Sequence, residues 1–413
     1  MPTVSRCPVR PDFDPLGPDF LADPFAVMAQ LPLAEEPVFY APAIDYHVVT
    51  RYEDVEAVFM DPQTYSAATA QLPLVALAPE AREILLAGGH RPQPSMVSLD
   101  PPAHTRLRRP AARAFSARRV AEMEPRVRAI LAAILDGIDP GEPFDLVSTL
   151  TFPFPATVVF SFMGVPPADY EQLKGWCGHR AVLGWGRPAP AEQVEHAENM
   201  AAYRRYLRDL VAAKAGARAD DFASALLAIH DEDPEQLSHE EIASILFSLS
   251  FAGHETTNYL IGNLVRRLLE DPARWDAVAA DPSLIQGAVD ETLRHDPSVP
   301  TWRRVTTRPA TLGGVDLPEG AKLLLWLAAA GRDTAVFDDP GEFDLRRANA
   351  KRHLAFGKGI HFCIGSALGR LEAALALEAL TERFPRLRLV PGQELTFSPN
   401  LSFRGPQALW VKG

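Results

Sequence analysis

The stretch FGKGIHFCIG, residues 356–365, indicates the fold of this chain more clearly than any other. It surrounds Cys363, one of only 3 cysteines, with glycines, aromatic side chains and a histidine. Gly357 and Gly359 can adopt a positive φ and form a tight bulge under the sulfur, and Gly365 permits close approach of the backbone to a flat bound ring. This setting is typical of a thiolate that is the single protein ligand of a metal. An inert buried cysteine, the usual fate of a lone cysteine, explains none of these neighbours.

A helical pattern begins directly after Cys363, at Ile364 to Leu368, and a late helix is predicted over Ala367 to Thr381. The N-terminus of this helix would face the sulfur. Its partial positive charge and free N–H groups stabilise an anion, so we expect the pKa of the Cys363 thiol to be lowered.

The composition is that of an ordinary globular protein, with 413 residues of which 47% are hydrophobic and 23% are charged. Three cysteines are too few for a disulfide framework, which favours a reducing compartment. The N-terminus lacks a signal-peptide pattern, and the longest apolar run, 242–253, is too short to span a bilayer. We therefore expect a cytoplasmic protein that does not enter a membrane. The net charge of −12 argues against a general nucleic-acid binder.

The first hundred residues predict several short elements of different types. Residues 1–35 are rich in proline and aspartate and are interpreted as an irregular arm. Two short β-like runs follow, at 37–40 and 46–50, and then a helix from Tyr52 to Met60. Residues 67–99 lack sustained periodicity and are interpreted as a long loop, a feature that is often functional inside a compact domain.

From Thr105 to about residue 270 the pattern is mostly helical. Ser238 and Glu241 form a capping box, which starts a helix that ends before Asp271 and is about 45–50 Å long. A second helix is predicted over 283–296, and short strands over 312–315 and 322–326. The sequence thus predicts a mainly α fold with a small β portion, in one compact unit over residues 1–413.

The motif Ala252-Gly253-His254-Glu255-Thr256-Thr257 lies in the middle of the long helix. Its small residues remove bulk from one helix face, and a carboxylate and a hydroxyl follow side by side. A threonine inside a helix can donate a hydrogen bond to an earlier carbonyl and bend the ladder. This predicts a groove for a small ligand beside a proton donor. A polar stripe on an exposed face is the weaker interpretation, because apolar stretches lie on both sides.

Two further pairs stand at helical spacing. Glu291 and Arg294 can pair on one face, and Arg346 would complete a buried carboxylate with two arginines. His104 and Arg108 could jointly hold an anionic group. Six arginines lie between Arg106 and Arg119, and on an acidic protein this favours docking of an acidic protein partner.

Together these motifs resemble those of the cytochrome P450 family over essentially the full chain. The pattern Phe-x-x-Gly-x-x-x-Cys-x-Gly is matched by Phe356, Gly359, Cys363 and Gly365. The long-helix pattern Ala/Gly-Gly-x-Asp/Glu-Thr-Thr is matched by residues 252–257, and Glu-x-x-Arg by Glu291 and Arg294.

Four other stretches are similar to the haem domains of self-sufficient bacterial P450s, which are fused to a reductase carrying FMN and a [2Fe–2S] cluster. They are EPVFY at 36–40, WGRP at 185–188, WRR at 302–304 and SFRGP at 402–406. No such reductase follows within the 413 residues, so we expect either an isolated haem domain or a stand-alone relative.

The resemblance implies a haem b whose iron is bound axially by Cys363. It implies that the propionates are held by His104, Arg108, Arg304 and His361, and that Phe356, Gly357 and Ala252 adjoin the cofactor. Glu291, Arg294 and Arg346 would then be structural.

The implied activity is that of a monooxygenase, which inserts one oxygen atom of O₂ into a small apolar or aromatic substrate by hydroxylation, dealkylation or epoxidation. Electrons would come from NAD(P)H through an FMN/[2Fe–2S] or ferredoxin reductase, and Glu255 and Thr256 would relay protons. Two alternatives are a peroxide-driven peroxygenase and a non-enzymatic haem-thiolate sensor. The intact Glu255–Thr256 pair favours O₂ activation over the first, and the small Ala252 and Gly253 argue against the second.

The substrate pocket is expected to draw on several mainly apolar segments, including the 67–99 loop. The residues expected to line it are Ser248, Phe251, Ala252, Val299, Pro300, Thr301, Leu401 and Phe403.

Overall fold

One long helix, α12 (His239–Leu269), runs through the middle of the computed structural model, which describes residues 7–89 and 95–413. The Ser238 hydroxyl accepts a hydrogen bond from the Glu241 N–H, and the Glu241 carboxylate accepts one from the Ser238 N–H at 2.9 Å. This confirms the predicted capping box. The helix has 31 residues, which corresponds to about 46 Å.

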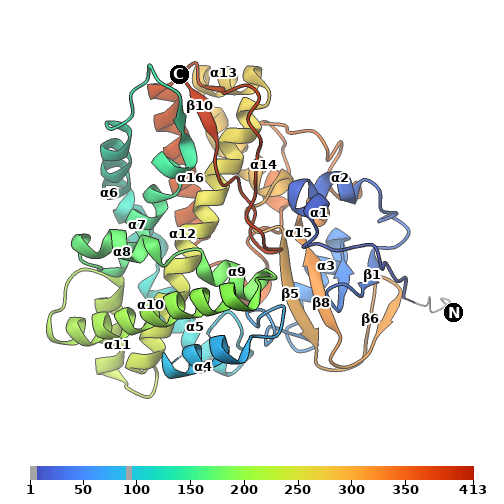
Figure 1. Cartoon of the computed structure of the whole chain (residues 1–413), viewed down its shortest axis with the longest axis horizontal. Helices are drawn as coiled ribbons and strands as arrows, with labels where there is room; N and C mark the ends of the chain where they lie inside the picture. Colours follow the sequence, from blue (N-terminus) through green and yellow to red (C-terminus); the bar gives the residue numbers. More distant parts are fainter. Residues whose placement is uncertain (1–6, 90–94) are drawn as a thin grey trace.

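Helices make up most of the remaining fold (Figure 1). They are α1 (Pro18–Ala22), α2 (Pro24–Met28), α3 (Tyr52–Met60), α4 (Pro79–Ala87), α5 (Ala103–Ala114), α6 (Ala117–Leu135), α7 (Pro153–Met163), α8 (Tyr170–Gly175), α9 (His179–Trp185), α10 (Pro190–Gly216), α11 (Phe222–Glu232), α13 (Pro272–Ala280), α14 (Ile285–His295), α15 (Leu327–Ala330) and α16 (Ser366–Arg383). Single turns of other helix types are η1 (Val147–Thr151), η2 (Pro167–Asp169), η3 (Pro282–Leu284), η4 (Ala350–Arg352) and η5 (Gly359–His361).

The strands form a mixed sheet on one side of the helices, in the order β1-β2-β8-β5-β3, and two smaller sheets. Their bounds are β1 (Val38–Ala41), β2 (Tyr46–Val49), β3 (Tyr65–Ser66), β4 (Phe144–Asp145), β5 (Thr301–Thr306), β6 (Ala310–Leu312), β7 (Val315–Leu317), β8 (Lys322–Trp326), β9 (Arg388–Leu389) and β10 (Trp410–Lys412). β2 and β8 pair in parallel, and β5 pairs antiparallel with both β8 and β3.

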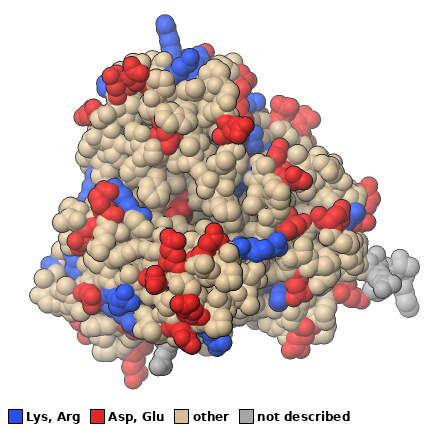
Figure 2. Space-filling model, viewed as in Figure 1, with Lys and Arg blue, Asp and Glu red and all other residues tan. Residues whose placement is uncertain are grey.

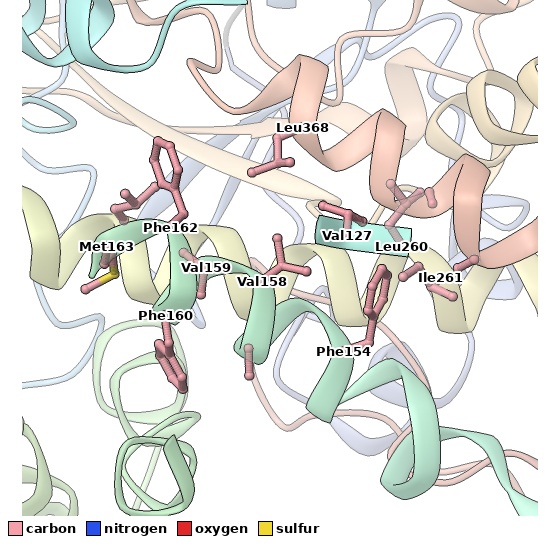
Figure 3. Close-up of a cluster of buried hydrophobic side chains, with 14 of the residues drawn as sticks. Val127, Phe154, Val158, Val159, Phe160, Phe162, Met163, Leu260, Ile261 and Leu368 are labelled. Atoms are coloured by element: carbon pink, nitrogen blue, oxygen red, sulfur yellow. The ribbon is translucent and has the colours of Figure 1, made fainter. Parts of the chain in front are cut away.

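The main core forms where α7 packs along α12 (Figure 3). Phe154, Val158 and Val159 of α7 are almost completely buried, as are Leu260 and Ile261 of α12. Burying an apolar side chain of this size contributes about 1.5–3 kcal/mol each to folding. This packing holds α12 rigidly, so the residues on its opposite face are fixed in place.

Three expectations about secondary structure were wrong. The 67–99 segment is not entirely loop, because residues 79–87 form α4, which begins at Pro79. Residues 90–94 of that segment lie outside the described part of the chain. Residues 312–315 are not one strand: Leu312 ends β6, Val315 begins β7, and Gly313 and Gly314, both with positive φ, form the turn between them. The 1–35 arm contains the short helices α1 and α2, each with proline in its first turn.

Acidic and basic side chains lie among uncharged residues on the surface in view in Figure 2. Within residues 7–89 and 95–413, no helix combines the length and the apolar character that are needed to cross a bilayer.

Candidate functional site

The segment around Cys363 folds as a tight loop that ends at the N-terminus of α16. The Cys363 N–H donates to the Phe356 carbonyl at 2.9 Å, which closes the loop. Gly357 and Gly359 have φ of 67° and 66°. A Cβ on Gly359 would lie 2.6 Å from the carbonyl oxygen of Phe59 on α3. Both glycines are therefore required by the backbone, and the loop is pressed against α3.

The pKa of the free Cys363 thiol is raised, not lowered as the sequence predicted. Burial is the larger effect and disfavours the thiolate. The N–H groups of Gly365 and Ser366 and the guanidiniums of Arg108 and Arg370 act in the opposite direction. The N–H groups at the start of α16 do favour the thiolate, as the sequence predicted, but the desolvation of the buried sulfur outweighs their contribution to the pKa.

Cys363 and the middle of α12 line the same cavity. Its walls carry side chains from α3, α5, α9, α11, α12, α15 and β5, and from the loops around residues 71, 96, 298, 356 and 403. They are Phe59, Gln71, Met96, Val97, Arg108, Ala111, Phe115, Trp185, Phe222, Ile245, Ser248, Leu249, Phe251, Ala252, Thr256, Ser298, Val299, Trp302, Arg304, Leu327, Ala355, Phe356, Gly357, His361, Cys363, Ile364 and Phe403. Most of these side chains are apolar, as in most small-molecule sites.

Within the α12 motif, Ala252 and Thr256 face the cavity, one helical turn apart. The Thr256 hydroxyl donates to the Ala252 carbonyl at 2.7 Å, as its sequence context predicted. Gly253 has a different role. A Cβ there would lie 2.9 Å from a methyl group of Val159, so Gly253 allows α7 to approach α12 and does not widen the cavity.

Glu255 does not line the cavity. Its side chain is 3% exposed and lies near Tyr259 and the Gly178 N–H. Burial raises the pKa of Glu255 to about 7, although the Tyr259 hydroxyl and the Gly178 N–H partly oppose this shift. An acid with this pKa exists in both protonation states near neutral pH, which is the property of a proton donor or acceptor.

One end of the cavity is strongly cationic. Arg108 and Arg304 reach it from α5 and β5, and neither forms an ion pair with a described acidic residue. The rings of His104 and His361 lie 4.3 Å apart, centroid to centroid, although only His361 lines the cavity itself. Both ring nitrogens of His104 and Nε2 of His361 are buried without a hydrogen-bond partner.

Unpaired buried polar groups are costly, and groups gathered in this way indicate a missing anionic ligand. Two carboxylates of a planar macrocycle would satisfy the two guanidiniums and the imidazoles. A thiol at the centre of one wall could bind the metal of that macrocycle. The donor set therefore fits a haem with its propionates at this end.

The glutamate–arginine cluster forms with a different arginine from the one predicted. Arg294 donates to both carboxylate oxygens of Glu291, at 2.6 and 2.7 Å, and Arg347 donates to one of them at 3.1 Å. Arg346 is instead 67% exposed in its side chain and points toward Asp281. The turn around Asp344, whose N–H also donates to Glu291, directs residue 347 inward.

Aromatic side chains form a second feature of the cavity. The rings of Trp185 and Phe251 are stacked at 5.8 Å and 5°, and Phe403 meets Trp185 edge-on at 5.0 Å. Trp302 lies 6.4 Å from Trp185. We call these four residues the aromatic wall.

Of the eight residues expected in the substrate pocket, Ser248, Phe251, Ala252, Val299 and Phe403 line the cavity. Pro300, Thr301 and Leu401 do not. Thr301 and Leu401 are each 1% exposed, and the Thr301 hydroxyl donates to the Leu401 carbonyl at 2.8 Å, so this pair connects two segments behind the wall.

Sequence reasoning missed several lining residues. One of them is Trp302, which stands two residues before Arg304 on β5 and so shares a face with that expected cofactor contact, as a strand assignment would have revealed. Phe115 directly follows α5, Phe222 begins α11 and Ile245 lies on α12, and no local signal brings these three residues together.

The arginines between Arg106 and Arg119 do not form a free basic patch. Four of the six are paired with acids: Arg106 with Glu241, Arg113 with Glu232, Arg118 with Glu122 and Arg119 with Asp220. Arg108 faces the cavity. The positive charge that the sequence predicted for docking is therefore largely neutralised on the protein itself.

Comparison with known proteins gives a consistent result. A family model described as Cytochrome P450 matches residues 195–406. The cytochrome P450 monooxygenase PikC of Streptomyces venezuelae is 38% identical over 422 residues, which cover 100% of this chain and 96% of that protein.

Two solved structures are also similar. The P450 heme domain of Tepidiphilus thermophilus has a TM-score of 0.93 at 34% identity, covering 97% of this chain and 96% of that chain. An intact type IV self-sufficient cytochrome P450 monooxygenase has a TM-score of 0.94 at 37% identity, covering 99% of this chain and 55% of that chain.

Proposed function

The chain belongs to the cytochrome P450 family of oxidoreductases, and from that premise we propose that it is a haem-thiolate monooxygenase acting on a small apolar or aromatic substrate. The observation that carries the proposal is that Cys363 lines the same cavity as Ala252 and Thr256 of α12. A metal ligand and a hydroxyl-bearing helix face thus share one space, and the aromatic wall lines the same space.

Haem b would be held through Cys363 on one side and through its propionates at the cationic end. Arg108 and Arg304 would pair with the propionates as charge-assisted donors, and His104 and His361 would donate or accept through the ring nitrogens that now lack partners. Phe356, Gly357 and Ala252 would contact its faces and edge. When bound, the haem supplies the redox chemistry of O₂ activation, and electron donation from a thiolate ligand favours O–O cleavage.

The protein's own residues would control protons and water. Thr256 holds its hydroxyl at the cavity surface, and its proton is directed to the Ala252 carbonyl until a better acceptor arrives. Glu255 immediately precedes Thr256 in the helix, and its side chain does not line the cavity. Its carboxyl group can carry a proton near neutral pH. We propose that Glu255 supplies protons to Thr256, directly or through water. The aromatic wall excludes bulk solvent from the reacting atoms.

The electrons would come from NAD(P)H through a reductase, either with FMN and a [2Fe–2S] cluster or of the ferredoxin type. The similarity to a self-sufficient P450 supports the first kind of donor. Because most arginines near Arg106–Arg119 are paired, the docking of such a donor would depend less on long-range charge than the sequence indicated.

Isotope labelling tests the proposed reaction. The purified holoprotein, supplied with NAD(P)H, a reductase and a small aromatic substrate under ¹⁸O₂, is expected to give a product with one ¹⁸O atom and water with the other. If ¹⁸O entered the product from labelled hydrogen peroxide but not from ¹⁸O₂, the result would support a peroxygenase instead. Absence of any oxygenated product over a panel of aromatics, alkanes and terpenes that shift the haem spin state would contradict a monooxygenase.

The raised pKa of Glu255 gives a pH-dependent prediction. The protonated carboxyl is the proton donor, so turnover is expected to fall as pH rises through about 7, where Glu255 loses its proton. Glu255→Gln cannot supply a proton, and we expect its rate to be about a hundredfold lower and flat across pH 6–8. The measurement is kcat against pH, with peroxide release recorded in parallel.

Glu372→Gln is the matched control, because Glu372 is also deeply buried and its pKa is raised well above the ordinary value. Glutamine mimics its neutral form, so this variant should keep the wild-type pH profile. A Glu255→Gln profile that still falls near pH 7 would remove Glu255 from the relay.

A further inference from the structure

Gln71 is a polar side chain among the mainly apolar walls of the cavity. It lies on the segment between β3 and α4, and its side chain lines the cavity. Its Oε1 accepts hydrogen bonds from the hydroxyls of Ser95 and Ser98, the latter at 3.5 Å. Because the amide oxygen is engaged, the amide N–H groups are the donors left for the cavity.

The backbone beside Gln71 is held in place by Arg303, which is fully buried on β5. The guanidinium donates to the Ala70 carbonyl at 3.0 Å and to the Gly184 carbonyl at 3.4 Å. It also lies 5.6 Å from the ring centroid of Trp185. Arg303 thus joins the residue before Gln71 to the residue before Trp185, and it forms no ion pair with an acidic residue within the described ranges.

A buried guanidinium without a carboxylate partner is costly, so its retention requires an explanation. In this protein the buried Arg303 guanidinium also holds two separate backbone segments in place. One side chain holds both the segment that carries Gln71 and the end of α9 that carries Trp185, one member of the aromatic wall. Arg303 therefore constrains the position of the amide relative to the Trp185 ring.

Gln71 shares the cavity lining with Met96, Val97 and Phe251. Once a ligand covers the amide there, the donor loses free energy unless the ligand accepts its hydrogen bond. We propose that Gln71 is a specificity-determining residue, which donates to one uncharged acceptor oxygen of a substrate whose flat apolar or aromatic body packs on the aromatic wall. Aryl ketones are the simplest members of this class. This inference rests on the proposed function and names the substrate class of the same site.

The test is a spin-state titration of the haem-loaded protein with matched ligand pairs. Each aryl ketone, with its carbonyl one, two or three bonds from the ring, is compared with the alkene in which C=CH₂ replaces C=O. Acetophenone and α-methylstyrene are the first pair. These ligands have nearly the same shape, so the ratio of their dissociation constants isolates the hydrogen bond.

In the wild type, at least one ketone is expected to bind about tenfold more tightly than its alkene. Gln71→Leu should reduce that ratio to about one by weakening the ketone alone. Gln71→Glu, which presents only acceptors, should invert it. Gln286→Leu makes the same exchange at an exposed position of α14 outside the cavity lining, and it should leave the ratio unchanged. A ratio near one throughout the wild-type series, or a preference that survives Gln71→Leu or is lost in Gln286→Leu, would overturn the inference.

Arg303→Lys separates positioning from general destabilisation. Lysine keeps the charge but cannot donate to both carbonyls in the same geometry. We expect the ketone-to-alkene ratio to fall severalfold in this variant. A uniform weakening of both ligands, with the ratio intact, would show that Arg303 supports the fold but does not position Gln71.

The outcomes also distinguish this inference from the function on which it rests. A wild-type protein without a haem-thiolate spectrum would contradict the proposed function. A wild type with that spectrum that binds ketones and alkenes equally would contradict only the role of Gln71.

Discussion

Cys363→Ser is expected to abolish the red-shifted absorbance band of reduced, CO-bound haem thiolate and to lower substrate oxidation by at least about a hundredfold. Serine places a hydroxyl, a far weaker ligand and electron donor than a thiolate, at the point where α16 begins. The side chains are similar in size, so the loop closed by the hydrogen bond from the Cys363 N–H to Phe356 should persist. The measurements are the reduced-CO difference spectrum and turnover with a reductase.

Cys177→Ser is the matched control for that experiment. Cys177 is half-buried, and its thiol donates to the Leu173 carbonyl at 3.3 Å, a bond that a serine hydroxyl can also make. This variant should keep the wild-type spectrum. If the red-shifted band survived in Cys363→Ser, the assignment of the axial ligand would be wrong.

Glu291→Gln is expected to give the largest loss of stability. The Glu291 and Arg294 side chains are both 0% exposed, and Arg347 is 8% exposed. Replacing the carboxylate leaves two guanidiniums without their counter-ion in the interior. Removing one partner of a buried pair costs about 3–5 kcal/mol. Urea unfolding, followed by circular dichroism, should show a lower midpoint with an unchanged slope.

Glu378→Gln provides the comparison on the surface. Its partner Arg128 is 48% exposed and Glu378 itself is 34% exposed, so this pair should contribute less than about 1 kcal/mol. If both variants lost the same stability, the cluster around Glu291 would not have the structural role assigned to it.

The parts of the fold that sequence predicted well are those with local physical signals. The capping box at Ser238 and Glu241 and the stop at Asp271-Pro272 are short-range patterns, and they give the bounds of α12 within one residue. Gly357 and Gly359 have the positive φ that their positions in the loop suggested.

The parts that could not be predicted depend on contacts between distant segments. Whether Arg346 or Arg347 reaches Glu291 is decided by the turn at Asp344, which shifts the inward position by one residue. Gly253 meets Val159 because α7 lies against that side of α12, and the motif alone does not reveal this neighbour. The sign of the Cys363 pKa shift depends on burial, which only the packed structure determines.

The contact of Arg303 with two separate segments has a consequence for redesign of the cavity. The segments around Ala70 and Gly184 both accept hydrogen bonds from this one guanidinium. The effects of substitutions in the two segments on ligand binding are therefore coupled energetically. Coupled sites show interaction free energies of about 0.5–3 kcal/mol in double-mutant cycles, whereas distant independent sites add nearly linearly. A library that varies the two segments one at a time would therefore misjudge the combinations, and the two segments have to be sampled jointly.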